Sequence, residues 1–201
     1  MAEGWVYRNI NIGMGAAAAS LSEMLQEPVE LSLPNVELMS GEKLAKAMKK
    51  LVGEDVSLVV ESFSGHFDGD AMLVFSKVHS MDLVRQLLKS EDLAISDLSE
   101  VEQEALVEIG NIILNACLGT LSNIFGKNMH YNIPFFTQGH CDDLLYFNNV
   151  DRKNQAVLLL TMQFVLEKTK IDGYLTILMD VDSMEIFNQN IEQYFDADPI
   201  V

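Results

Sequence analysis

The longest regular pattern in the chain is a helical recurrence of apolar residues over positions 97–126. Asp97 and Ser99 are N-cap candidates, and Glu100 and Glu102 follow them by three residues. Gly126 supplies a stop signal at the other end. Because an N-cap residue with an acid three positions later is typical of a helix start, the pattern predicts one long helix over residues 97–126.

Four other segments predict helices. Residues 5–26 are rich in alanine and match the long helix, although Gly13 and Gly15 either weaken this second helix or allow a neighbour to pack closely. Shorter helices are predicted over residues 41–52, 80–89 and 183–194.

The strand signals are runs of β-branched and large apolar residues between the predicted helices. They cover residues 29–33, 56–63, 71–76, 144–148, 156–166 and 174–179. Residues 64–66 and 168–170, each with an Asp-Gly pair close behind, predict hairpin turns. Since helices and strands do not alternate strictly, we expect an α+β fold with long helices packed on a mixed or antiparallel sheet.

The chain also resembles itself. Asn11 and Asn111 lie 100 positions apart, as do Leu21-Ser22 and Leu121-Ser122, and Pro34 and Pro134. Later matches, such as residues 78–83 with 181–186, have an offset of 103, as loop insertions would cause. These ordered matches predict an internal duplication, with one domain over residues 1–201 made of two pseudo-symmetric halves, about 1–95 and 96–201. Chance similarity between two amphipathic helices is the alternative.

Composition and charge limit the kinds of partner. The 201 residues are 49% hydrophobic and carry 13 basic against 30 acidic side chains, a formal net charge of -17. That apolar content suits a globular core. Because binding to a polyphosphate or an anionic lipid surface requires Lys and Arg, so acidic a chain argues against nucleic acid and membrane-surface partners.

Cysteine usage and hydropathy favour a soluble protein of the cytoplasm. Cys117 and Cys141 make neither a disulfide framework nor a CxxC pair, and the first residues do not resemble a signal peptide. Residues 109–126 are uncharged and about as long as a membrane helix, but they include Asn111, Asn115 and Asn123. Since a bilayer would leave those amides without partners, we expect a helix buried on one side and no membrane insertion.

A polar stripe marks the long helix. At 100° per residue, Glu104, Glu108, Asn111 and Asn115 fall within about 60° of one another. The opposite side of the helix has apolar residues, which we expect to be buried: Leu106, Ile109, Ile112, Ile113, Ala116 and Ile124. A solvated face is the ordinary explanation of such a stripe. An Asn amide has no usable pKa near neutrality, but it can orient a water molecule for attack on a phosphoryl group, as carboxamides do in GTPases.

The string Glu108-Ile109-Gly110-Asn111, with 22 residues between Asn111 and Pro134, resembles the signature of the CheC, CheX and FliY group of bacterial chemotaxis phosphatases. Asn11 and Pro34 repeat the same spacing in the first half. A duplicated chain with one such unit in each half is similar to CheC. The resemblance covers nearly the whole chain.

The resemblance implies a function and roles for the site residues. The substrate would be the aspartyl phosphate of the response regulator CheY, whose own Mg²⁺ and lysine neutralise the phosphoryl group. Glu108 would pair with that lysine and Asn111 would position the attacking water, with Glu104 and Asn115 as possible supporting residues. This chain would then need no cofactor or metal of its own. Its four histidines, His66, His79, His130 and His140, have no metal-ligand spacing.

The chain departs from the family pattern at three positions. The family often has Asp or Ser at the position of Glu104, so this chain keeps an acid on the helix surface there. In the first half Arg8 matches Glu108, and Gly4 matches Glu104. Since a cation at Arg8 would repel the partner's lysine, the sequence predicts a degraded first site at Arg8 and Asn11 and a working second one. A first site that shifted its contacts is the alternative.

A second functional class stays open. Flagellar switch proteins share this fold without the Glu-x-x-Asn pair, so a non-catalytic binding module of the FliM type, or a scaffold for the receptor deamidase CheD, is the competing hypothesis. The intact pair Glu108 and Asn111 favours the phosphatase.

Overall fold

The computed structural model describes residues 2–89, 97–145, 155–166 and 169–197. The five α-helices in this part of the chain are α1 (Ala2–Leu25), α2 (Gly41–Val52), α3 (Lys77–Leu88), α4 (Glu100–Phe125) and α5 (Val181–Ala197). The strands are β1 (Val29–Ser40), β2 (Asp55–Gly65), β3 (Gly69–Ser76), β4 (Met129–Tyr131), β5 (Phe135–His140), β6 (Gln155–Leu166) and β7 (Thr169–Asp180). A short 3₁₀ turn, η1 (Cys141–Leu145), follows β5.

All strand pairs of the sheet are antiparallel, in the order β1-β6-β7-β3-β2-β4, with β5 also paired to β2. The strands of the two halves can be matched as β1 with β4/β5, β2 with β6 and β3 with β7. With this matching the strand order reads the same from either edge of the sheet. The α+β class with two pseudo-symmetric halves is therefore confirmed. The duplication as an origin stays a prediction, and the boundary between the halves at 95/96 falls outside the described residues.

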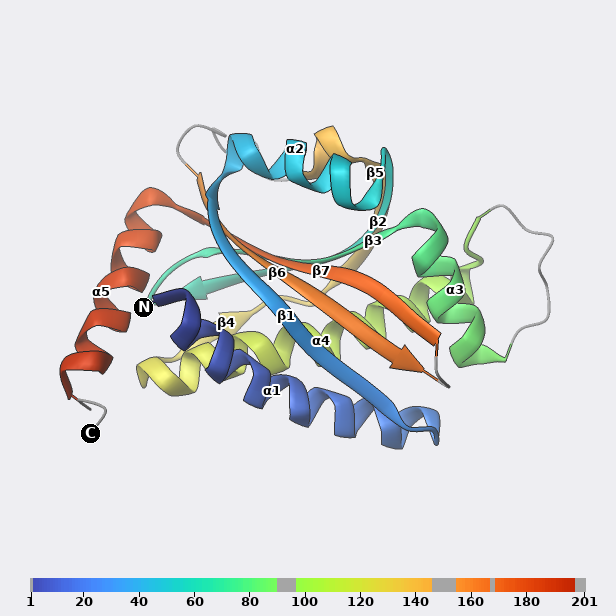
Figure 1. The fold of residues 1–201 in the computed structure, drawn as a ribbon, viewed down its shortest axis with the longest axis horizontal. Coiled ribbons are helices and arrows are strands. Elements are labelled where there is room, and N and C mark those ends of the chain that lie inside the picture. The colour runs from blue at the N-terminus through green and yellow to red at the C-terminus, as the bar shows by residue number, and fades with distance from the viewer. Residues whose placement is uncertain (1, 90–96, 146–154, 167–168, 198–201) are drawn as a thin grey trace.

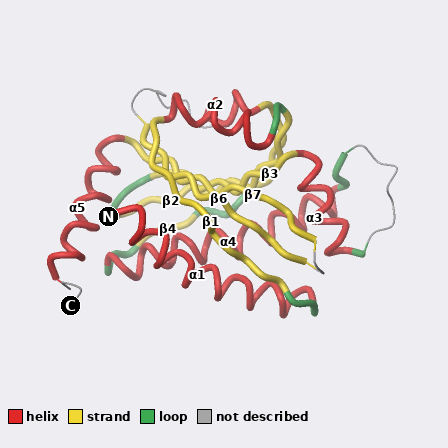
Figure 2. The backbone as a smooth tube through the Cα atoms, viewed as in Figure 1, coloured by secondary structure: helices red, strands yellow, loops and turns green. Residues whose placement is uncertain are grey.

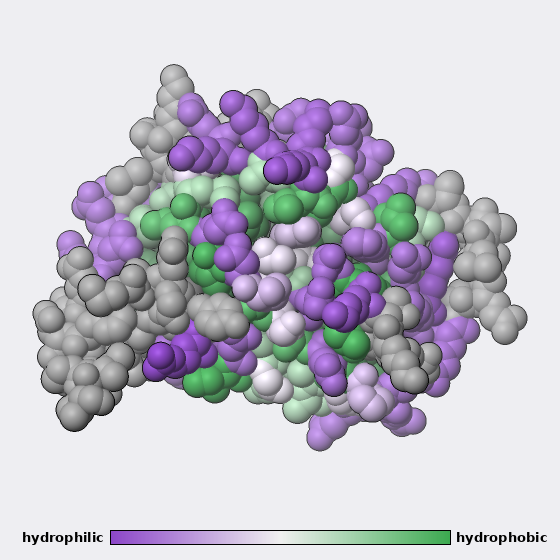
Figure 3. Space-filling model, in the orientation of Figure 1, coloured by the Kyte–Doolittle hydropathy of each residue, from purple (hydrophilic) through white to green (hydrophobic). Residues whose placement is uncertain are grey.

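The helices form layers on the two faces of the sheet. The helices α1 and α4 lie side by side on one face, and α2 lies on the other (Figures 1 and 2). The main hydrophobic core fills the α1/α4 side, and a smaller core lies beneath α2. Hydrophilic side chains gather over the outer surface of α2 (Figure 3). At Gly13 an added methyl group would collide with Thr120 and the Ala116 carbonyl of α4, so this glycine lets the two helices pack closely, one of the two readings of its sequence signal.

The start of α4 is fixed by a capping box. The Ser99 backbone N–H donates to Glu102 Oε2 at 2.7 Å, and the Glu102 N–H donates to Ser99 Oγ at 3.4 Å. Arg85 of α3 adds an ion pair, with its Nε 3.3 Å from Glu102 Oε1. Gly126 ends the helix with φ of 60°. These contacts set where the helix begins and therefore which of its residues face outward.

The other end of α4 is held by aromatic packing. Phe125 meets Phe67 and Phe187 edge to face, with ring centroids 5.9 and 5.4 Å apart. Phe67 and Phe187 also pack on each other at 5.8 Å. Each such contact favours one arrangement of the rings, so α4 is fixed at both ends.

One predicted strand is wrong. Residues 144–148 were expected to be extended, but Cys141–Leu145 is a 3₁₀ turn, and residues 146–148 lie outside the described residues. The Cys141 N–H donates to the Glu54 carbonyl at 3.0 Å, and the Cys141 thiol donates to the Gly53 carbonyl at 2.8 Å. These bonds turn the chain at the end of β5.

Several boundaries also differ from the prediction. The strands β4 and β5 were not predicted, and β1 continues to Ser40 instead of ending at Leu33. The predicted hairpin at 64–66 is confirmed by the β2–β3 pairing. Of the predicted hairpin turn at 168–170, Lys168 is outside the described residues, while β6 and β7 pair on either side of it.

The helix α4 is the one helix in the described ranges that is long and apolar enough to cross a membrane by length and composition. In the structure its apolar side, including Leu106, Ile109 and Ile113, is buried in the main core. The helix that the sequence predicted to be buried on one side is thus observed.

Candidate functional site on the outer flank of α4

The predicted polar stripe faces away from the core. Glu104 and Glu108 are exposed, and Asn111 and Asn115 are half-buried. On the opposite side of the helix, Ile109 is 1% exposed. The apolar residues Ile112 and Ala116, which we expected on the buried side, are only half-buried, and the side chain of Ile124 is not described. The structure therefore brings the four polar residues together on one accessible flank.

The two asparagines of the stripe are hydrogen-bonded to each other. Asn115 Nδ2 donates to Asn111 Oδ1 at 2.7 Å. This bond orients the Asn111 amide and occupies one lone pair of its oxygen. Among the described residues the Asn111 side chain has no other hydrogen bond, which leaves its second lone pair and both N–H groups to a water molecule or a substrate.

The glycine of the motif marks the closest approach of α4 to the sheet. A methyl group added at Gly110 would lie 2.5 Å from Cγ1 of Val59 in β2. Gly110 therefore lets the helix sit directly on the strand and fixes the depth at which Glu108 and Asn111 emerge. Sequence reasoning did not identify this role, because a glycine within a helical pattern is ambiguous without its neighbour.

Both prolines of the motif lie where an outer strand has one residue more than its partner. Around Pro34 the β1–β6 register shifts between the pairs Ser32–Gln163 and Asn35–Thr161. Pro134 separates β4 from β5, both of which pair with β2. Proline suits a bulge because it has no N–H to donate to the ladder. Pro34 is exposed and Pro134 is buried.

The first half is built differently at the matching positions. Asn11 Oδ1 accepts the backbone N–H of Leu33 at 3.2 Å, at the bulge of β1. Gly15, which has no side chain, takes the place of Asn115. Arg8, in the place of Glu108, is exposed, and Gly4 lies in the first turns of α1. The side-chain carbonyl of Asn11 thus accepts a hydrogen bond from the backbone of β1.

A shallow groove lies beside the acidic end of the stripe. It has a volume of about 360 Å³ and is lined by Glu100, Gln103, Glu104, Val107 and Phe136. Four of these residues come from α4, and Phe136 comes from β5. The groove thus extends the surface around Glu108 toward the start of α4.

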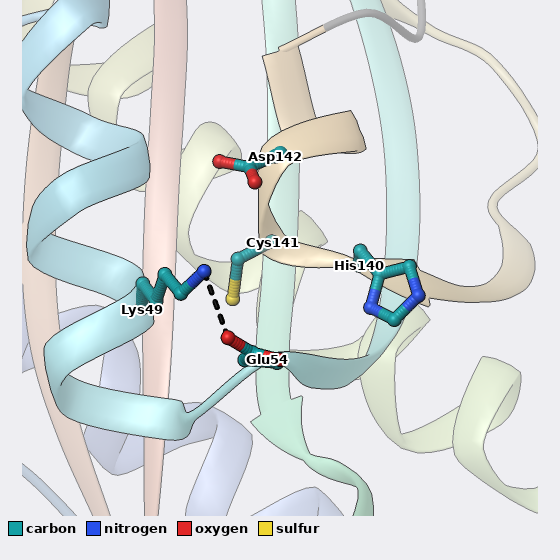
Figure 4. A pocket seen from close by; sticks show the side chains of 5 residues that line it. All are labelled: Lys49, Glu54, His140, Cys141 and Asp142. Carbon is teal, nitrogen blue, oxygen red and sulfur yellow. Dashed lines mark ion pairs between the residues drawn. The ribbon is translucent and has the colours of Figure 1, made fainter.

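A second cavity of about 240 Å³ lies at the end of α2, lined by Lys49, Glu54, His140, Cys141 and Asp142 (Figure 4). Lys49 Nζ and Glu54 Oε1 form an ion pair at 2.9 Å. Burial raises the pKa of the Cys141 thiol to about 11, which leaves it uncharged and weakly nucleophilic at neutral pH. These contacts describe a structural junction between α2, β2 and η1.

Within the described ranges no group of three His, Cys, Asp or Glu side chains is placed to hold a metal ion. Cys117 and Cys141 are both free thiols buried in the fold. Burial raises the pKa of Cys117 to about 12.

One buried acid was not noticed in the sequence. Glu61 of β2 is 1% exposed, and its Oε2 has no hydrogen-bond partner among the described residues. Burial raises its pKa to about 7. Tyr131 is close enough to interact with the charge of Glu61. An acid in the middle of a strand that otherwise reads as buried gives only a weak sequence signal for such a site.

No protein-family model matches the chain. The chain is 24% identical over 128 residues to the CheY-P phosphatase CheC of Bacillus subtilis, a match that covers 62% of this chain and 60% of that protein. The match therefore spans less than two thirds of the relative's length.

Solved structures share the fold over more of the chain. FliY from Thermotoga maritima has a TM-score of 0.75 at 17% identity and covers 96% of both chains. The FliM middle domain from H. pylori has a TM-score of 0.65 at 14% identity, over 92% of this chain and 94% of that one. The CheX–CheY–BeF3–Mg²⁺ complex from Borrelia burgdorferi has a TM-score of 0.50 at 18% identity, over 84% of this chain and 97% of that one. In sequence and fold the resemblance to the CheC, CheX and FliY group is confirmed.

Proposed function

We propose that this chain is a CheC-type phosphatase that hydrolyses the aspartyl phosphate of a phosphorylated CheY-type response regulator. The observation that carries the proposal is the Asn111 amide, held by Asn115 on an accessible flank of α4 with Glu108 one turn away. The relative in Bacillus subtilis is a CheY-P phosphatase, and a CheX of similar fold has been crystallised with CheY. Both support a regulator of this kind as the partner.

In the proposed reaction the regulator contributes the phosphoryl group together with its own Mg²⁺ and lysine. Glu108 pairs with that lysine, which fixes the orientation of α4 over the phosphorylated aspartate. Glu104 adds a second carboxylate on the same flank. None of these contacts requires a cofactor or metal belonging to this chain.

The role of Asn111 is to position a water molecule in line with the bond that breaks. The free lone pair of its oxygen accepts a hydrogen bond from that water. Water oxygen attacks phosphorus, the bond from phosphorus to the aspartyl oxygen breaks, and the aspartate leaves as a carboxylate. The proton of the water goes to the phosphate product, because an amide has no basic site near neutrality.

The first half contributes no second catalytic site in this proposal. The Asn11 carbonyl is engaged by Leu33, and both Glu108 and Asn115 lack an equivalent there. One chain therefore carries one working site. This deepens the expectation, based on Arg8 alone, that the first site is degraded.

The test is phosphate release from phosphorylated regulators of the same cell in the presence of Mg²⁺. We expect this protein to accelerate release from its cognate regulator. If it accelerates none of them, the phosphatase proposal is wrong.

The second candidate function is a non-catalytic binding module. The likeness to the FliM middle domain supports it, since the same fold occurs there in a flagellar protein. A chain that binds a response regulator, or CheD, without changing the lifetime of the phosphoryl group would favour this function. In either case we propose a cytoplasmic protein with protein partners and no nucleic acid or membrane insertion.

A further inference from the structure

Two large apolar residues on either side of the buried Pro134 are exposed to solvent, one almost fully and one in part. Ile133 is 91% exposed and Phe135 is 45% exposed. Leu33, which matches Ile133 in the first half, is 1% exposed. At the matching bulges of the two halves, one apolar residue is buried in the core and its counterpart is exposed to water. Core packing therefore does not account for Ile133.

The contacts at its two ends place this segment along the flank of α4. The side chain of Ser122, near the end of the helix, lies close enough to Tyr131 to act on the pKa of its hydroxyl. Phe136 lines the groove with Glu104 and Val107, near its start. Residues 132–135 must therefore run beside the part of α4 between positions 107 and 122, which contains Asn111 and Asn115. Five extended residues span about 17 Å, which is enough to run beside most of this part of the helix, about 22 Å long.

The groove beside this segment is acidic. Glu100 and Glu104 line it, and Glu108 follows one turn beyond Glu104. Across the part of the chain that the structure describes, the ion pairs involve other acids: Glu27, Glu54, Asp55, Asp97 and Glu102. The surface thus combines exposed apolar side chains with carboxylates that form no ion pair among the described residues. Its complement is a partner surface with apolar residues next to Lys or Arg.

We propose that Ile133, Phe135 and the groove lined by Glu104 and Phe136 form the docking surface for the response regulator and determine which regulator is accepted. The inference rests on the proposed function. A regulator that brings a phosphoryl group to Asn111 lies next to both Ile133 and the groove, because the segment runs beside Asn111 and the groove begins about one turn away, at Val107. Ile133 and Phe135 then contribute binding, while the chemistry stays with Asn111.

The experiment measures kcat and KM for phosphate release from the phosphorylated cognate regulator with Ile133→Ser, Phe135→Ser and the double variant. Because two large apolar side chains lose their burial against the partner, we expect the KM of the double variant to rise at least ~10-fold with kcat within about twofold of wild type. Ile133→Ser alone should raise the KM several-fold. Melting curves check that each variant is folded.

Val78→Ser and Leu38→Ser are the matched controls, since these side chains are 65% and 47% exposed on other elements, α3 and β1. We expect both to keep the wild-type KM. An unchanged KM in folded Ile133→Ser and double variants would overturn the docking surface, and so would an equal rise in the controls. A change in oligomeric state without a change in KM would make the patch a contact between copies of this chain and would also overturn it.

Failure of the proposed function is recognised separately, because wild type would then not accelerate phosphate release. Calorimetric titration of the regulator into each variant decides the inference in that case. Weaker binding by Ile133→Ser but not by Val78→Ser would support the docking surface. Equal binding by wild type and the double variant would contradict it.

Discussion

Asn11 and Asn111 occupy matching positions in the two halves and make different contacts. The Asn11 carbonyl accepts a main-chain N–H from Leu33 at 3.2 Å, whereas the Asn111 carbonyl accepts a side-chain N–H from Asn115 at 2.7 Å. The first contact satisfies a backbone N–H group of β1, and the second orients a side-chain amide on the accessible flank of α4. The identity of the residue alone therefore does not define a site. The residue four positions later, Gly15 or Asn115, distinguishes the two.

Asn115→Ala removes the hydrogen bond that orients Asn111. We expect kcat for phosphate release to fall roughly 5- to 10-fold, the equivalent of about 1 kcal/mol for one hydrogen bond, with little change in KM. Steady-state kinetics on the phosphorylated regulator measures both constants. Asn123→Ala, an exposed position of the same helix, is the control and should leave kcat unaltered.

Asn11→Ala acts on stability and leaves catalysis intact. Loss of the acceptor for the Leu33 N–H should lower the free energy of unfolding by about 1–2 kcal/mol. Denaturant titration measures that loss, and kcat per folded molecule should equal that of wild type. Arg8→Glu should give no gain in activity, because Asn11 and Gly15 would still not form a site. A clear gain would mean that charge alone had silenced the first half.

Helices were easier to predict than outer strands. The capping box and Gly126 mark the ends of α4 in the sequence, and the structure has the helix within three residues of the predicted start and one of the predicted end. The strand β4 is three residues long and β5 is separated from it by a bulge, so neither shows the period of a strand. The apolar run at 144–148 was assigned as a strand because its periodicity does not reveal the turn that Cys141 makes with Gly53 and Glu54.

The geometry of the site was only partly predictable from the sequence. Periodicity placed Glu104, Glu108, Asn111 and Asn115 on one flank. The engagement of Asn11 by Leu33 and the groove beside Phe136 depend on contacts between distant segments, which no local pattern specifies.

Gly110→Ala tests the seating of α4 on β2. The added methyl group would meet Val59, so the helix must shift, and we expect a loss of about 1–3 kcal/mol in stability together with lower kcat. Gly119→Ala is the matched control in the same helix, since nothing lies within 4 Å of its added methyl group. That change should stabilise the protein by up to about 1 kcal/mol. If both substitutions stabilise it, the close approach at Val59 does not constrain the helix.

The fold as a whole carries a net charge of -17 and one buried acid without a partner for Oε2, within the described residues. Burial raises the pKa of Glu61 in the folded protein to about 7, above the ordinary 4.5 of the unfolded chain. The folded state therefore holds this proton more tightly than the unfolded state does. The associated stability is fully present below about pH 4.5 and is lost as the pH rises toward 7 and beyond.

Glu61→Gln should remove this pH dependence. At pH 8 the variant should be more stable than wild type, by up to about 3 kcal/mol if the full shift is realised, and near pH 4.5 the two should be similar. Denaturant titrations from pH 4.5 to pH 8 provide the comparison. If the free energies of unfolding of the two proteins change in parallel with pH, ionisation of Glu61 does not destabilise the folded state.

The central claim is that one amide, Asn111, gives this protein its activity. The most direct test is the rate of phosphate release from the phosphorylated cognate regulator, with Mg²⁺, in the presence of wild type, Asn111→Ala or Asn11→Ala. We predict that wild type and folded Asn11→Ala accelerate release equally, and that Asn111→Ala returns the rate to that of the regulator alone. Full activity in Asn111→Ala, or equal loss in both variants after correction for the folded fraction, would contradict the account.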